Sequence, residues 1–212
     1  MLGRMTVSED LANSLTHGFG LLLSLAGAPW LVYVANAQGD FLHALSCVIY
    51  SATLVALYAA STLYHSVRSP GWRQKMRTVD HACIYLLIAG TYTPLALVSL
   101  RGQTGWLLCG AVWGLAALGI CFKLFFTERF ERFSTLTYVL FGWIAILVAG
   151  PLVESLHARA VAWVLVGGVA YTGGVFFYLW DRRYAHAMWH VCVLVGSACH
   201  YLVITCYVSP PA

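Results

Sequence analysis

Charged residues are scarce in this chain: they make up 9% of the 212 residues, whereas 60% are hydrophobic. A soluble globular domain has roughly 25% charged residues. The polar residues are too few to cover a soluble core of this size, but a bilayer tolerates apolar surface all round a helix. The composition therefore predicts a protein that crosses a membrane several times.

The sequence also lacks a disulfide framework and a strongly basic patch. Its seven cysteines are odd in number, lie within apolar stretches and show no CxxC spacing. The net charge of +4 comes from short clusters between apolar runs, so nothing indicates nucleic acid as a partner. A cleaved signal peptide would need a more basic start than Arg4 alone provides, and we expect the first apolar run to be retained.

What the sequence does contain is a series of long apolar runs. A helix needs about 20 mainly apolar residues to cross the hydrocarbon, and barrel strands would instead be short and alternate with period two. The runs therefore predict an all-α bundle of seven transmembrane helices in a single domain of residues 1–212. The predicted helices are 17–36, 41–64, 80–100, 105–126, 135–154, 160–180 and 187–208.

The basic residues are unevenly divided between the two ends of this predicted bundle. By the positive-inside rule the richer end is cytoplasmic, which places the N-terminus in the cytoplasm and the C-terminus outside. This orientation is opposite to that of rhodopsin-like receptors. The poorer end has Arg101 and Arg159. The richer end has Arg4, Arg68, Arg73, Lys75, Arg77, Lys123, Arg129, Arg132, Arg182 and Arg183.

Local features add three structural expectations. The polar stretch 68–78 predicts the longest loop, which could lie as an interfacial turn between the second and third helices. Pro94 removes a backbone donor inside the third run and predicts a kink, with Thr91 or Thr93 bonding the freed carbonyl. Gly110 and Gly114 form a small-xxx-small pair that is typical of close helix contact.

Residues able to carry chemistry gather at the basic end of the predicted bundle. His186 and His190 are four residues apart, so both imidazoles lie on one face of the last helix. Ser61 and His65 have the same spacing near the end of the second helix, and Asp80 begins the third helix on the same side. These five residues predict a shared site.

Three neutral imidazoles suit a zinc ion with a fourth position open for water. Asp80 could hold that water, which would ionise near neutral pH, and Ser61 could hydrogen-bond the water or a developing oxyanion. Each residue also has a structural interpretation. The histidines could pack at the headgroup level, Asp80 could face the N-terminal helix dipole, and Ser61 could bond its own backbone.

Two further groups of polar residues lie outside the predicted ligand set. Glu9, Asn13 and His17 form an i, i+4, i+8 stripe that either supports the site and lines the cavity mouth or is an amphipathic lead-in to the first helix. His200 follows His190 by ten residues and lies about 15 Å deeper by helical rise. It cannot share the ion and is expected to be a buried hydrogen-bonding residue, as in a proton path.

The chain resembles the bacterial hemolysin III proteins, the prokaryotic branch of the progestin and adiponectin receptor group. The resemblance covers nearly the whole chain and is carried by stretches 9–18, 60–65, 80–94, 186–190 and 196–200. It implies seven helices in the bacterial inner membrane and a zinc ion held by His65, His186 and His190, accompanied by Ser61 and Asp80. It also suggests a metal-dependent hydrolase of lipid amides.

Three functions agree with these observations. The first is an intramembrane zinc hydrolase that acts on a lipid amide or ester entering from the bilayer. The second is a non-enzymatic protein, either a pore that affects ion balance or a cytolysin. The third is a sensor in which the zinc is structural. The expected partner is membrane lipid, and the sequence leaves the oligomeric state open.

Overall fold

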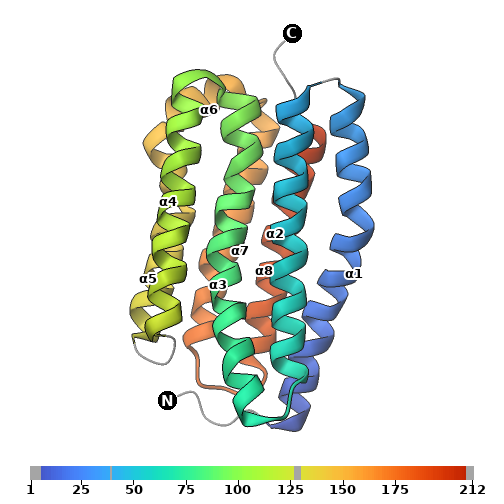
Figure 1. Ribbon diagram of the computed structural model, residues 1–212, viewed down its shortest axis with the longest axis vertical. Coiled ribbons are helices and arrows are strands. Elements are labelled where there is room, and N and C mark those ends of the chain that lie inside the picture. The colour runs from blue at the N-terminus through green and yellow to red at the C-terminus, as the bar shows by residue number, and fades with distance from the viewer. Residues whose placement is uncertain (1–5, 39, 127–129, 209–212) are drawn as a thin grey trace.

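The computed structural model describes residues 6–38, 40–126 and 130–208, and the side chain of Glu131 is not among the features described. These residues form a bundle of helices with no strand. Seven of the helical segments are long and apolar enough to cross a membrane, which confirms the predicted all-α, seven-helix membrane fold. In Figure 1 the described chain begins at the bottom of the bundle and ends at the top.

Five of the seven spans are single α-helices. Spans that are adjacent in sequence pack side by side (Figure 1). The first helix, α1 (Val7–Ala37), also packs against the last, α8 (Ala185–Cys206), which closes one side of the bundle. The helices are α1 (Val7–Ala37), α2 (Phe41–Ser66), α4 (Gly102–Phe126), α7 (Ala158–Leu179) and α8 (Ala185–Cys206).

The other two spans change helical geometry partway across. The third span is α3 (Pro70–Pro94) followed by a π-helix, η1 (Leu95–Leu100). The fifth is α5 (Glu131–Gly142), a 3-10 turn η2 (Ile144–Val148) and α6 (Ala149–Ser155). The third span is the most buried of the seven and the fifth the least. The core therefore surrounds α3, while the broken fifth span forms a loosely packed wall.

The change at Pro94 only partly matches the prediction. The chain passes into π geometry at Leu95, since a proline cannot supply the usual donor. Thr93 donates to the Ala89 carbonyl and Thr91 to the Leu87 carbonyl, at 2.8 Å each. Neither hydroxyl therefore bonds the Gly90 carbonyl, the one that Pro94 leaves without its helical partner, and the predicted threonine replacement was wrong.

The predicted long loop between the second and third helices was also wrong. Only residues 67–69 separate α2 from α3, and the polar stretch 70–78 is helical. Pro70 occupies the first turn, where its missing N–H costs nothing. Hydropathy marks the part of a helix that lies in hydrocarbon, so a polar first turn is mistaken for a loop. For the same reason α1 begins ten residues before its apolar run.

The predicted contact of Gly110 and Gly114 is not present. A Cβ atom built on either glycine meets no atom within 4 Å among the described residues, so both lie on an outer face of α4. Gly105 and Gly119, on the same helix, do allow close packing. A Cβ on Gly105 would lie 2.2 Å from the Ala96 carbonyl oxygen of η1, and a Cβ on Gly119 would lie 2.4 Å from the Tyr85 ring.

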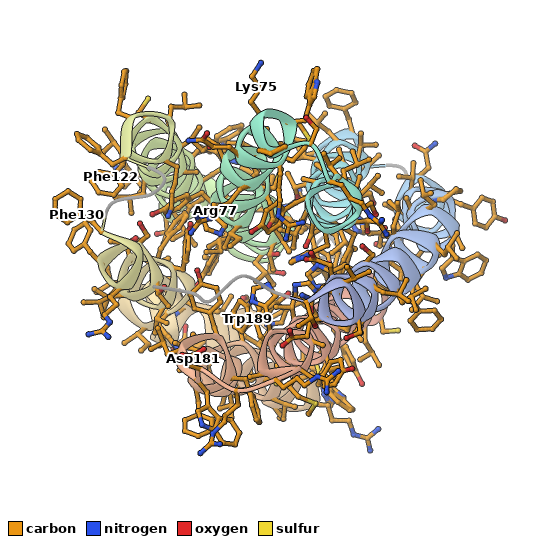
Figure 2. The ribbon with its side chains drawn as sticks, turned by 90° about the horizontal axis from the view of Figure 1, so that it is seen from below. Lys75, Arg77, Phe122, Phe130, Asp181 and Trp189 are labelled. Carbon is orange, nitrogen blue, oxygen red and sulfur yellow. The ribbon has the colours of Figure 1, made fainter. Side chains whose placement is uncertain are left out.

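Basic residues collect at the bottom end of the bundle, which we call the basic end. Figure 2 views this end and shows Lys75 pointing away from the bundle and Arg77 lying over its interior. Arg101 and Asp40 form an ion pair at the other end. Of the ten residues predicted on the basic side, Arg4 and Arg129 lie outside the described residues.

Candidate metal centre

His65, His186 and His190 come together at the basic end, between the last turn of α2 and the first turns of α8. One ring nitrogen from each lies within 4.8 Å of the others. The ring centroids are 4.7 Å apart for His186 and His190, and 5.1 Å apart for His65 and each of the other two. This cluster could hold a metal ion.

The second ring nitrogen of His65 is fixed by a carboxylate. The Nδ1 atom lies 3.2 Å from the Asp10 Oδ1 atom, and Arg73 donates to the same oxygen at 2.7 Å. A carboxylate can only accept, so Nδ1 carries the hydrogen. The Nε2 atom of His65 is buried with no hydrogen-bond partner among the described residues. A buried lone pair held in this way is what a metal ligand requires.

His190 is oriented by the backbone of α1. Its Nδ1 atom lies 3.2 Å from the Asn13 carbonyl oxygen and 3.1 Å from the Thr16 hydroxyl. Because a carbonyl only accepts, Nδ1 carries the hydrogen and Nε2 keeps its lone pair. The Asn13 side-chain nitrogen also lies 3.4 Å from the Nδ1 atom of His65. Asn13 therefore contacts two of the three histidines.

His17 packs against the cluster without hydrogen-bonding to it. Its ring stacks on His190, with centroids 3.6 Å apart, and meets Tyr58 edge-on at 5.0 Å. Both nitrogens of His17 are buried with no partner among the described residues, as is the Nδ1 atom of His186. The residues present thus leave several buried nitrogen atoms around one point, which fits a bound cation with nitrogen ligands.

Glu9 lies apart from the histidines. Its carboxylate accepts from the Thr6 backbone N–H at 2.9 Å, completing a capping box at the start of α1. It also accepts from the Tyr184 backbone N–H at 3.2 Å. Tyr184 precedes α8 in a left-handed conformation, with φ of 61°. Glu9 therefore ties the start of α1 to the start of the helix that carries His186 and His190.

Ser61 and Asp80 face the histidine cluster across a cavity of about 130 Å³, which we call the proximal cavity. Both side chains are buried, and the Ser61 hydroxyl lies beside the Asp80 carboxylate. His17, His186, His190 and His200 line the same cavity. Most of the predicted site residues therefore line the proximal cavity. His65 and Asn13 do not line it but contact histidines that do, and Glu9 lies outside it.

A second cavity of similar volume, the distal cavity, adjoins the first. The two share Thr91, Tyr92, Gly142, Trp143, Gly168 and His200. Beyond these residues the distal cavity is lined by apolar side chains of α6 and α7, including Leu152, Val161 and Leu165. Together the cavities form a space that is polar at the histidines and apolar toward the opposite end of the bundle.

Sequence reasoning missed Asp10, Thr16, Arg73 and His81 as members of this site. His81 lines the proximal cavity, and its Nδ1 atom has no partner among the described residues. A helical projection could have found Asp10. At about 100° per residue, Asp10 lies about 20° from His17 around the helix, whereas Glu9 lies about 80° away.

Comparison with known proteins gives a consistent result. Residues 5–201 match the family model described as haemolysin-III related. The chain is 42% identical to Hemolysin-3 of Bacillus cereus over 212 residues, covering 99% of this chain and 97% of that protein. It is 39% identical to a Hemolysin-3 homolog of Bacillus subtilis, covering 95% of each chain.

A more distant relative is found in humans. The monocyte to macrophage differentiation factor of Homo sapiens is 28% identical over 212 residues, covering 95% of this chain and 85% of that protein. The family model extends along the membrane bundle and covers the positions of all three clustered histidines. The chain therefore belongs to the haemolysin III family, within the progestin and adiponectin receptor group.

Proposed function

We propose that this protein is a zinc-dependent hydrolase of a lipid amide or ester in the bacterial inner membrane. The observation that carries the proposal is the position of three clustered imidazoles at the polar end of a long, mainly apolar space within a membrane bundle. The basic end is proposed to face the cytoplasm because of its excess of lysine and arginine.

The donor set favours zinc among the divalent ions. Imidazole nitrogen is a ligand that zinc prefers, and a site with three protein ligands leaves a position for water or substrate. Calcium and magnesium prefer oxygen ligands instead. When bound, a zinc ion would supply Lewis-acid activation of water and of a carbonyl group at neutral pH.

The remaining steps fall to side chains of this chain. Asp80 is the carboxylate that lines the proximal cavity, and we assign it the role of orienting the attacking water and accepting its proton. The buried Ser61 hydroxyl would donate to the developing oxyanion. Asp10 would hold His65 in place throughout.

The shape of the two cavities supports a lipid as the substrate. An acyl chain placed in the distal cavity would contact Leu152, Val161 and Leu165 while its carbonyl lies near the histidines. A path for ions would need polar groups or water along its length. The apolar lining of the distal cavity therefore favours a hydrocarbon chain over the alternative of a conducting pore.

The test is release of fatty acid from amide-linked and ester-linked lipids by the purified, zinc-loaded protein in liposomes, measured by mass spectrometry. Asp80→Asn should lower the rate by about 10²- to 10⁴-fold, the usual contribution of a general base, and keep its zinc. Asp181→Asn removes an exposed carboxylate at the rim of the basic end and should leave the rate unchanged (Figure 2). No turnover across lipid classes by zinc-loaded protein would overturn the hydrolase proposal.

A further inference from the structure

Unpartnered polar atoms are unevenly placed along the two cavities. Among the described cavity-lining residues, most of the buried ring nitrogens without a hydrogen bond lie near the metal cluster, on His17, His81 and His186. One more lies well apart from them, the Nδ1 atom of His200. His200 lines both cavities where they meet. It is ten residues beyond His190 on the continuous helix α8, which is about 15 Å.

The other ring nitrogen fixes the tautomer of His200. The Nε2 atom lies 3.3 Å from the Val164 carbonyl oxygen of α7. A carbonyl can only accept, so Nε2 carries the hydrogen and Nδ1 keeps a buried lone pair without a partner among the described residues. Nδ1 is therefore an acceptor, and only a donor can satisfy it.

The ring of His200 is also held in position. A Cβ atom on Gly167 would lie 2.5 Å from the Nε2 atom, so only glycine leaves room for the ring there. The ring also packs against Tyr171, one turn further along the same face of α7, with centroids 5.5 Å apart. Contacts with α7 therefore fix the position of the His200 ring at the junction of α7 and α8.

Neighbouring polar side chains are already satisfied. The Tyr171 hydroxyl bonds Ser197 at 2.8 Å, and Trp143 donates to Thr172 at 2.8 Å. The Tyr92 hydroxyl donates to the Gly142 carbonyl and accepts from the Ala145 backbone N–H. The described side chains around the junction therefore give the Nδ1 atom of His200 no donor.

We propose that the lipid accepted by this cavity carries a hydroxyl group in the interior of its acyl chain, and that the hydroxyl donates to the Nδ1 atom of His200. The chain would be apolar between the metal centre and His200, and apolar again beyond it in the distal cavity. An oxo group at the same carbon has no hydrogen to donate, so the site discriminates a hydroxyl from a ketone. This inference rests on the proposed lipid site but not on hydrolysis.

The experiment measures binding rather than turnover. Zinc-loaded protein in detergent is saturated with a fluorescent fatty acid, which is displaced by stearic acid, by a positional series of monohydroxylated stearic acids, or by the matching oxo acids. The quantity of interest is the affinity ratio of hydroxylated to plain acid in wild type divided by the same ratio in a His200 variant. Partition into micelles cancels in this double ratio.

His200→Phe keeps an aromatic ring against Tyr171 and removes the acceptor, and His200→Asn keeps a hydrogen-bonding side chain. We expect a double ratio of about 2- to 10-fold for His200→Phe, the range of a single net hydrogen bond, with the preference limited to mid-chain positions. His200→Asn should keep part of it. If neither variant folds, wild type should still bind hydroxylated acids more tightly than oxo acids after correction for measured micelle partition.

Two results would overturn the inference, and they differ in whether the proposed lipid site survives. A double ratio near one, with tight binding of every acid, would show that water satisfies His200 and would leave the lipid site standing. Failure of every acid to displace the probe, or of the probe to bind, would remove the lipid site itself and with it the proposed function.

Discussion

Asp10 provides the sharpest test of how the metal centre is held. Its carboxylate lies 3.2 Å from the Nδ1 atom of His65 and 2.7 Å from a terminal nitrogen of Arg73. Loss of such a partner to a ligating histidine typically costs 10- to 100-fold in metal affinity, or about 1.4 to 2.8 kcal/mol. The Asp10 side chain is 20% exposed, so part of its charge is screened.

Asp10→Asn keeps an oxygen acceptor for His65 and removes the charge, so we expect zinc affinity to fall by about 10-fold. Asp10→Ala removes both and should approach about 100-fold. Affinity is measured by competition with a fluorescent zinc chelator at fixed pH. Glu9→Gln is the matched control. It changes the adjacent acid, which caps α1 and bonds Tyr184, and should leave zinc affinity unchanged. Equal losses of zinc affinity in Asp10→Asn and Glu9→Gln, or no loss in Asp10→Asn, would contradict this role of Asp10.

Two further predictions concern stability. Gly105→Ala should destabilise the bundle by about 1–3 kcal/mol through overpacking, because its Cβ would lie 2.2 Å from the Ala96 carbonyl oxygen. The control is Gly114→Ala on the same helix, whose Cβ meets open space. Equal unfolding free energies for the two variants would contradict this packing. The His43 backbone N–H and the Arg101 guanidinium hold the pKa of Asp40 below its usual value. This carboxylate therefore stabilises the fold above pH of about 4, and the effect is lost as pH falls through the lowered pKa. The advantage of wild type over Asp40→Asn in unfolding free energy should disappear on acidification, and an advantage that grew in acid would contradict the ion pair.

The number and type of helices could be predicted from hydropathy because each run is long and continuously apolar. Their limits could not, since the first turns of α1 and α3 are polar and lie beyond the apolar runs. The break of the fifth span does have a sequence signal, because Pro151 lies in the first turn of α6 and cannot donate to the Leu147 carbonyl of η2. Gly110 and Gly114 show the limit of motif spacing, because the pattern does not reveal which face of α4 meets another helix.

The site was predicted in part for a clear physical reason. Spacing of four residues places two side chains on one helical face, and charge bias places the helix ends at one depth, so the proximity of His65, His186 and His190 followed. The partners of these histidines depend on how α1 packs across α2 and α8. Asp10 rather than Glu9 reaches His65 because α1 turns that face inward. The junction at His200 depends on the backbone of α7 and could not be read from α8 alone.

The central claim is that the three histidines hold one zinc ion. Its most direct test is metal analysis of the wild-type protein, purified without chelator, beside His186→Ala and the control Glu9→Gln. We expect a single zinc ion per chain in wild type and in Glu9→Gln, and a large loss of zinc in His186→Ala. Wild-type protein free of zinc, or His186→Ala with an undiminished zinc content, would contradict it.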